Sequence, residues 1–435
     1  MTEDFLQYVW GQRLYASAEQ RTTDGDVVEV LNPGRLNTDA GPDFFNAQVR
    51  VGGTTWAGNI EVHKTTDEWF RHGHDSDPAY DNVILHVVGQ SSGRKVTTSR
   101  GETVPEVVLR FDMSLYERYE ALRSVKGLES IRCAEVLRSV PSVVSIAWLD
   151  ALVAERMGQK ADLALRHIDE FKGDVDQAFF CLLARSMGSR VNSEPMELMA
   201  RHTPLRVLLK HNGNIQTEAV LLGQAGLLES CQAGSDYVTA LKREYALLRA
   251  KFGLSPIDGS IWKYARLRPQ NFPDVRLVQL AAIVRALPGN FESCLSLPLN
   301  DVLSVTPSDY WDTHYRLGVQ SHSVCAKGLG VATRRLVVVN AVVPFALAEA
   351  RRYADAGRQS FALDLLKDLP MERNSVIDRW REVGIEPQNE ADAQALLHLS
   401  SAYCDKGECL RCRFGHFAIS RGQAPAPFMT LSAIK

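Results

Sequence analysis

The chain has 435 residues, with 49 lysines and arginines against 52 aspartates and glutamates and a formal net charge of −3. This length corresponds to about two or three domains. The charge balance excludes a strongly basic protein, although a local basic patch can still bind nucleic acid.

No apolar run approaches the roughly 20 residues that cross a bilayer. The first residues, MTEDFLQYVWGQRLY, are acidic and amphipathic, unlike a signal peptide. We therefore expect a cytoplasmic protein. Its eight cysteines are then thiols or metal ligands, because disulfides are rare in that compartment.

In chain order, Thr2 can cap a first helix, and strands are expected over 27–31, 44–51 and 55–64. A short helix near Trp69, a strand over 83–88 that is buried on both faces, and a strand within 104–111 follow. Apolar spacings of three and four then predict helices over 143–170, 175–188, 216–230, 236–252, 274–287, 330–355 and 388–403. The fold class is therefore an α-β-β-β-α-β domain (1–112), an all-helical domain (113–400) and a Cys-rich segment (401–435).

The densest polar group lies in the first domain. Asp43 precedes the second strand, and Glu61 and His63 leave the same face of the third strand. A hairpin of these strands can bring Asp43 close to Glu61. Two converging carboxylates suit Mg²⁺ or Mn²⁺, and a coordinated water can then attack a phosphodiester.

The segments GPDFFNAQV and GNIEVHK, set between an opening helix and a helix–strand pair, resemble the PD-(D/E)XK nuclease superfamily. The resemblance implies a restriction-endonuclease-like domain with Asp43 and Glu61 as metal-binding acids. His63 stands where the superfamily usually has its catalytic lysine, and we expect it to orient or deprotonate water. Lys64 is adjacent, but alternation sends it to the other face unless a bulge intervenes.

The chain as a whole also resembles an uncharacterised bacterial family of unknown function. The shared segments read GPDF, then G-N-x-E-x-H, then W-x-x-H-x-H-x-x-D, then L-H-V-V, at residues 41–44, 58–63, 69–77 and 85–88. This second resemblance implies no established activity.

A group of histidines follows the third strand. His72 and His74 lie beside Asp75 and Asp77, and His86 lies on the next strand. These residues form either a solvated loop with one packed histidine or a transition-metal site. We favour function for His74 and His86, and a zinc hydrolase built on His63, His74 and His86 stays open.

The cysteines near the end follow the spacing Cys404-x4-Cys409-x2-Cys412. Soft thiolates select zinc or an iron–sulfur cluster. His416 would complete a local zinc site. Some nucleases of the resembled superfamily hold a 4Fe–4S cluster with one remote and three clustered cysteines, which implies Cys133 as the fourth ligand. Three reduced thiols are the remaining alternative.

A basic segment carries Lys263, Arg266, Arg268 and Arg276, interleaved with Trp262, Tyr264 and Phe272. Cations beside aromatic rings suit phosphate contact and base stacking, although such a run is also typical of a solvated face.

The leading hypothesis is a metal-dependent nuclease or phosphodiesterase whose partner is nucleic acid, DNA before RNA, with no membrane partner. The alternative is a non-catalytic nucleic-acid-binding or scaffold protein with a degenerate nuclease fold, which the missing lysine at position 63 favours.

Overall fold

The computed structural model describes residues 1–16, 20–125, 131–232, 234–287, 289–295, 302–371 and 373–420. The chain forms two compact units. The first contains Met1–Leu152, Arg373–Pro387 and Ala395–Lys435, and the second contains Val153–Glu372 and Gln388–Gln394. The first unit thus extends beyond residue 112 and takes in the Cys-rich segment, of which 421–435 lie outside the described residues.

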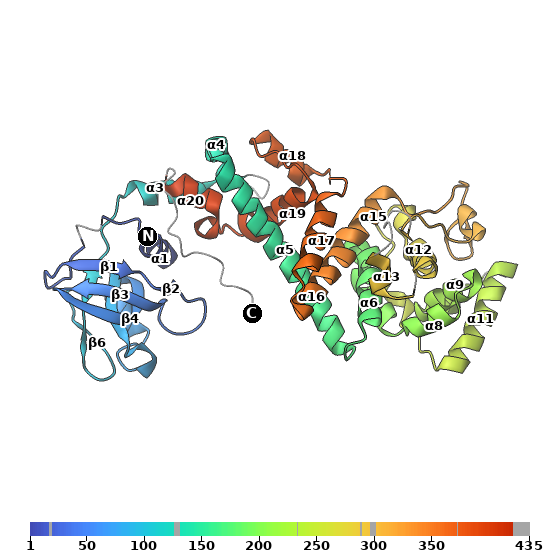
Figure 1. The fold of residues 1–435 in the computed structure, drawn as a ribbon, viewed down its shortest axis with the longest axis horizontal. Coiled ribbons are helices and arrows are strands. Elements are labelled where there is room, and N and C mark those ends of the chain that lie inside the picture. The colour runs from blue at the N-terminus through green and yellow to red at the C-terminus, as the bar shows by residue number, and fades with distance from the viewer. Residues whose placement is uncertain are drawn as a thin grey trace. The chain divides into compact units, whose positions relative to one another are not determined.

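The first unit is built around a mixed sheet in the order β1-β3-β4-β5-β8, with β2 paired to β3 (Figure 1). Its leading elements are α1 (Glu3–Gly11), β1 (Val28–Asn32), β2 (Arg35–Leu36), β3 (Phe44–Val51), β4 (Thr54–Thr65), α2 (Asp67–Arg71), β5 (Val83–Gln90), β6 (Val96–Thr97), β7 (Thr103–Val104) and β8 (Glu106–Val108). The strands β1, β3 and β4 pair antiparallel, whereas β4, β5 and β8 pair parallel. The N-terminal region is therefore mixed α/β, as predicted.

One face of the sheet is apolar and packs against α1. Ile60 and Val62 of β4 are fully buried in the same cluster as Phe5 and Leu6 of α1. Thr2 stands at the N-cap of α1 but makes no capping hydrogen bond through its side chain, contrary to expectation. Because side chains alternate along a strand, the residues between these apolar positions face the other side of the sheet.

The opposite face carries a smaller apolar cluster around α2. Trp69 of α2 is fully buried with Val83 of β5, Val96 of β6 and Val104 of β7. The polar residues of β4 and β5 that point away from α1 are therefore enclosed rather than exposed.

The remaining elements among the described residues of the first unit are helices. Its further elements are α3 (Ser114–Ser124), α4 (Ala134–Leu137), α18 (Ser375–Glu382), η7 (Leu399–Cys404), η8 (Cys409–Arg411) and α20 (Arg413–Ser420). The hydroxyl of Tyr8 lies 2.8 Å from Nδ1 of His416, and Nε of Arg118 donates to the carbonyl of Ile419 at 2.5 Å. These bonds hold the C-terminal helix α20 against α1 and α3.

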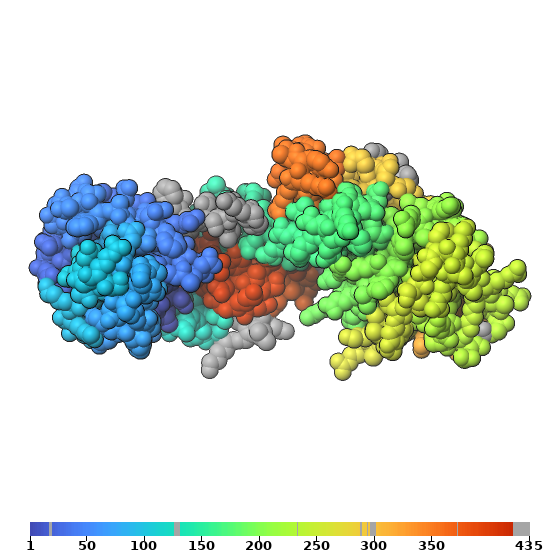
Figure 2. Space-filling model, turned by 90° about the horizontal axis from the view of Figure 1, so that it is seen from below, coloured from blue at the N-terminus to red at the C-terminus, as the bar shows by residue number. Residues whose placement is uncertain are grey.

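The second unit is largely helical, and α6 to α12 lie together in green to yellow in Figure 2. The helices of this part of the chain are α5 (Ser142–Glu170, shared with the first unit), α6 (Val175–Met187), α7 (Ser189–Arg201), α8 (Leu205–Lys210), α9 (Asn214–Gln224), α10 (Leu227–Ser230), α11 (Asp236–Phe252), α12 (Pro273–Ala286), α13 (Phe291–Leu295), α15 (Val331–Val337), η6 (Val338–Val342), α16 (Val343–Tyr353), α17 (Ala356–Lys367) and α19 (Glu390–His398, also shared). The predicted helical region is therefore confirmed in outline. A short hairpin of β9 (His314–Arg316) and β10 (Val319–Gln320) interrupts it.

One helical stretch among the described residues, Val331–Tyr353, is long and apolar enough to cross a membrane, contrary to the expectation that no segment comes near that length. In its most apolar window 67% is buried inside the protein, as in a core helix.

Candidate metal centre

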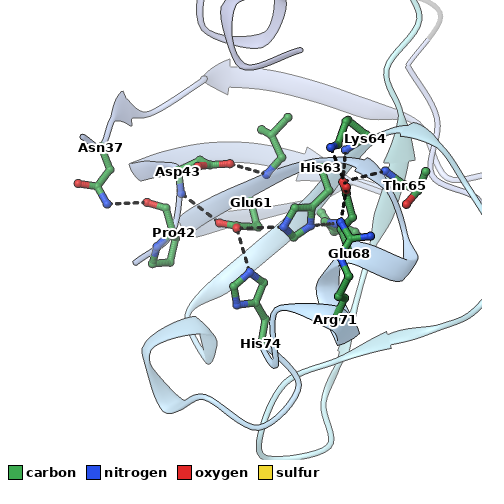
Figure 3. Close-up of polar contacts among 12 residues, drawn as sticks. Asn37, Pro42, Asp43, Glu61, His63, Lys64, Thr65, Glu68, Arg71 and His74 are labelled. Carbon is green, nitrogen blue, oxygen red and sulfur yellow. Dashed lines mark hydrogen bonds and ion pairs between the residues drawn. The ribbon is translucent and has the colours of Figure 1, made fainter. Parts of the chain in front are cut away.

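The β3–β4 hairpin brings the two predicted acids together. Phe44 pairs with Ile60, which places Asp43 beside Glu61. The backbone N–H of Asp43 donates to Oε2 of Glu61 at 3.1 Å, and the N–H of Val62 donates to Oδ2 of Asp43 at 2.9 Å. Each carboxylate thus accepts a hydrogen bond from the backbone of the segment that carries the other acid (Figure 3).

A row of polar residues crosses the sheet on the face opposite α1. Glu61 on β4 is in register with His86 on β5, and His86 is in register with Glu106 on β8. His63 lies two residues beyond Glu61 and shares this face. All four side chains are buried. Buried polar groups need partners, so the contacts between these residues decide what the row can do.

The row forms a hydrogen-bonded chain. Oε2 of Glu106 lies 3.1 Å from Nδ1 of His86, Nε2 of His86 lies 2.9 Å from Nδ1 of His63, and Nε2 of His63 lies 3.4 Å from Oε1 of Glu61. Burial raises the pKa of Glu106, but hydrogen bonds from His86 and Ser91 lower that pKa by more. Glu106 is therefore ionised and can only accept hydrogen bonds.

The charge state of Glu106 fixes the tautomers along this chain. His86 must donate through Nδ1 to Glu106, and therefore accepts at Nε2 from Nδ1 of His63. His63 is then left with a lone pair on Nε2, the atom that faces Glu61. A ligand histidine held at its other nitrogen by a hydrogen-bonded partner is the usual arrangement in metal sites.

Two more histidines approach from the segment after α2. His63, His72 and His74 offer ligand atoms that all lie within 4.8 Å of one another. His74 is buried and stacks on Tyr80 at 3.7 Å, whereas His72 is exposed. Nε2 of His74 lies 3.3 Å from Oε1 of Glu61 and has no hydrogen-bond partner among the described residues. The three converging imidazoles are thus His63, His72 and His74, whereas His86 was expected in place of His72. His86 instead hydrogen-bonds to the other ring nitrogen of His63.

The acids and the histidines have shifted pKa values. Burial, followed by repulsion from Glu61, raises the pKa of Asp43 to about 7, and burial raises that of Glu61 to about 8. Burial lowers the pKa of His63 well below its usual range, and burial also lowers those of His74 and His86. The site at neutral pH therefore holds neutral imidazoles and partly protonated carboxyl groups. The imidazoles can bind a cation through a free lone pair, and the carboxyl groups can bind it by releasing their protons.

Four residues of this site escaped the sequence analysis. Glu106 lies on a strand that was expected, but its pairing to β5 was not. Glu3 and Gln7 come from α1: repulsion from Asp43 adds to burial in raising the pKa of Glu3, and Gln7 hydrogen-bonds to Asp43. The sequence signal that could have identified Glu3 and Gln7 was the presence of polar residues in the opening amphipathic helix, which packs beside the segments that carry the two acids.

The fourth of these residues, Glu68, anchors two cations at the rim of the site. Nζ of Lys64 lies 3.0 Å and Nη2 of Arg71 lies 2.5 Å from Oε1 of Glu68 (Figure 3). Glu68 also accepts the backbone N–H of Lys64 at 2.8 Å. The side chain of Lys64 is 47% exposed and that of Arg71 62% exposed, so positive charge faces solvent beside the acids and histidines.

The predicted basic segment lies in the second unit and uses its aromatic rings internally. Trp262 is buried and donates to the carbonyl of Ala225, and Tyr264 donates to Asp274. These contacts are typical of aromatic residues that anchor a solvated face, which is the alternative to base stacking. Phe272 contacts the ring of Tyr264.

The four cations of this segment differ in exposure. Lys263, Arg266 and Arg268 are exposed and stay candidates for phosphate contact. The guanidinium of Arg276 is engaged with Asn271 at 2.6 Å and with Gln279 at 2.9 Å, so the structure does not present it to a ligand.

Fold and site together define a mixed α/β protein with a helical region, in which one sheet face carries buried acids and imidazoles that can hold a divalent metal ion. Residues 3–375 match the family described as "Protein of unknown function (DUF2851)", and the chain belongs to that family. Neither the curated proteins nor the solved structures gave a match to this chain.

Proposed function

We propose that the chain is a metal-dependent phosphodiesterase that cleaves nucleic acid at the site formed by Asp43, Glu61, His63 and His74. The observation that carries this proposal is the chain from Glu106 through His86 to His63. It leaves an unprotonated Nε2 facing the buried carboxyl group of Glu61, which Asp43 adjoins. Packing alone does not explain why the free lone pair of His63 is buried beside carboxyl groups.

The donor set indicates which ion fits. Asp43 and Glu61 supply hard oxygen atoms, whereas His63 and His74 supply imidazole nitrogens. Mg²⁺ prefers oxygen ligands, while Mn²⁺ accepts carboxylate and binds imidazole more readily, so Mn²⁺ suits the mixture best. When bound, a divalent ion supplies Lewis acidity toward a phosphate and lowers the pKa of a coordinated water.

The chain's own residues divide the remaining tasks. His63 serves as a nitrogen ligand rather than as the base, because its lowered pKa makes it a poor proton acceptor. Glu61 and Asp43 release protons as the ion binds, so metal affinity rises with pH across the neutral range. Glu106 and His86 hold the ring of His63 in place.

Three features support nucleic acid as the substrate. Lys64 and Arg71 place exposed positive charge beside the acids, where a phosphate backbone can be held. The arrangement of an acid before β3, an acid on β4 and a parallel β5 supports a PD-(D/E)XK-like domain. Exposed Lys263, Arg266 and Arg268 add cations in the helical unit.

The test is cleavage of single- and double-stranded DNA and RNA with Mn²⁺, Mg²⁺ or Zn²⁺, comparing wild type with Glu61→Gln. The amide keeps the shape but removes the ligand charge, so cleavage should fall by at least about a hundredfold, the scale of losing one electrostatic stabiliser. Glu102→Gln, at an exposed acid of the same unit, is the matched control and should cleave like wild type.

Equal cleavage by wild type and Glu61→Gln would assign the activity to a contaminant and refute the proposal. Cleavage by neither protein, with nucleic-acid binding retained, would instead support the degenerate-nuclease alternative.

A further inference from the structure

A second cluster of ligand-type side chains lies in the first unit, away from the sheet. Cys133 stands at the N-cap of α4, and Cys404 ends η7. Cys409 begins η8, and Cys412 precedes α20. More than 250 residues separate Cys133 from Cys404, yet α4, η8 and α20 form one contact group, since α20 packs against both η8 and α4.

Direct contacts join the two parts of this group. Cys133 and Cys409 pack in the same hydrophobic cluster. An added Cβ on Gly407 would lie 3.2 Å from Nη1 of Arg132, so the residue next to Cys133 reaches over the turn between Cys404 and Cys409. Electrostatic repulsion couples the Cys133 thiol to each of the three C-terminal thiols and adds to burial in raising its pKa. Cys133 therefore lies in the same buried cluster as Cys409, beside the turn that follows Cys404.

Backbone and side-chain groups of the same segments surround the sulfur atoms. The backbone N–H groups of Phe414 and Gly415 donate to the sulfur of Cys412. The guanidinium of Arg132 lowers the pKa values of Cys404 and Cys409, although burial outweighs it. An added Cβ on Gly415 would lie only 2.0 Å from the carbonyl oxygen of Cys409, so glycine there allows η8 to lie against α20.

We propose that Cys133, Cys404, Cys409 and Cys412 form a four-thiolate metal centre, distinct from the site on the sheet. Cysteines from two remote parts of the chain meet in one buried contact group, and a bound metal ion deprotonates its thiol ligands. Zinc and iron–sulfur clusters are the groups that four cysteines hold in proteins. The proposal does not depend on the activity of the sheet site.

A single zinc ion and an iron–sulfur cluster would hold the four sulfurs at different spacings. Zinc at about 2.3 Å from each sulfur would hold the sulfurs about 3.8 Å apart. A 4Fe–4S cluster places its four ligands around a larger core.

The centre would have a structural consequence. It would tie the beginning of the helical region to the C-terminal segment, whose helix α20 is bonded to Tyr8 and Arg118. Loss of the metal should therefore loosen the attachment of α20 to α1 and α3.

The experiment is anaerobic purification of the full chain, followed by iron, zinc and acid-labile sulfide analysis and a visible absorbance spectrum. Iron and sulfide at about four each per chain, with brown colour, would assign a 4Fe–4S cluster. One zinc per chain in a colourless protein would assign the simpler four-thiolate site. Either metal should be lost in Cys133→Ser and in Cys412→Ser. It should be retained in the control Cys181→Ser, a buried thiol of the second unit.

Thiol labelling keeps the proposal testable if these variants fail to fold. Folded wild-type protein is treated with an alkylating reagent before and after metal removal by a chelator. Four additional thiols should react after removal, and the melting temperature should fall. A protein without metal from anaerobic purification, whose thiol reactivity and melting temperature do not respond to the chelator, would overturn the proposal.

Discussion

His74 shows most clearly, at the residue scale, that the buried imidazoles do more than fill space. Its ring stacks on Tyr80 at 3.7 Å, and its buried Nε2 makes no hydrogen bond among the described residues, although Oε1 of Glu61 lies 3.3 Å away. A buried polar atom that makes no hydrogen bond has a cost in stability, and the facing carboxyl group offsets part of that cost. Evolution tends to keep such a cost where the atom has a function.

We therefore predict that His74→Phe separates stability from metal binding. Phenylalanine keeps the stack on Tyr80 and removes the unsatisfied nitrogen, so the melting temperature without metal should stay equal or rise. The affinity for Mn²⁺ should fall at least tenfold, because one ligand is lost. Thermal denaturation and Mn²⁺ titration measure the two effects. A large loss of stability with unchanged Mn²⁺ affinity would make His74 a packing residue.

The two acids predict a specific dependence of stability on pH. The pKa values of Asp43 and Glu61 are raised in the folded state to about 7 and about 8, so the folded state binds protons that the unfolded state has released. Stability without metal is therefore lost as pH rises through these values. The neutral histidines act in the opposite direction only below about pH 6.5, where unfolded histidine becomes charged.

The melting temperature of metal-free protein should accordingly fall between about pH 6.5 and 8.5, a range set by the ordinary histidine pKa and the raised carboxyl values. Glu61→Gln should reduce the fall, because the amide does not titrate, and Glu102→Gln should not. Identical pH profiles for wild type and Glu61→Gln would show that the Glu61 carboxyl is not protonated in the folded protein.

At the scale of elements, parallel pairing of β5 with β4 and β8 creates the relay behind His63. The register aligns Glu61, His86 and Glu106 in one row. Within this hydrogen-bonded relay, His63 is the residue that contacts Glu61. Glu106 therefore acts on the site only through the imidazole rings of His86 and His63.

Glu106→Gln is therefore expected to lower Mn²⁺ affinity by about 10- to 100-fold, the usual effect of losing a partner of a ligand histidine. The amide can donate to Nδ1 of His86, which reverses the tautomers and leaves Nε2 of His63 protonated. Glu106→Asp, which retains an acceptor, should recover part of the affinity. If Glu106→Gln binds Mn²⁺ like wild type, the tautomer argument fails.

Local patterns explain which parts were predictable. Alternation and turn residues placed the strands that became β3, β4 and β5, and the β3–β4 hairpin follows from two strands joined by Gly52-Gly53. His86 was expected as a ligand, and its observed hydrogen bonds to His63 and Glu106 could not be predicted, because they depend on parallel pairing of β5 with β4 and β8. Glu106 escaped notice for the same reason. The burial of Trp262 depends on contacts with α9 and α10 that no local pattern reveals.

For the whole molecule, the apolar core of the sheet is shared with later parts of the chain. Phe5 stacks on Tyr119 of α3 with ring centroids 5.1 Å apart. Leu115 and Leu122 of α3 and Ile419 of α20 are buried in the same cluster. The predicted first domain, residues 1–112, therefore lacks part of its own core.

We predict that a fragment of residues 1–112 will not unfold cooperatively, because truncation exposes Phe5 and the apolar face around it. The full chain should show a cooperative transition of the sheet region. Circular dichroism and thermal denaturation of both proteins provide the comparison. A sharp transition in the fragment would show that α3 and α20 are dispensable for this core.

The central claim, that the acids and imidazoles on β4 hold a divalent metal ion, is tested most directly by a crystal grown with Mn²⁺ and an anomalous difference map. We predict one strong peak about 2.2 Å from a carboxylate oxygen of Glu61 and from Nε2 of His63, the usual distances for such ligands. The peak should be absent from crystals of Glu61→Gln. A wild-type map with no peak among Asp43, Glu61, His63 and His74 at saturating Mn²⁺ would contradict the account.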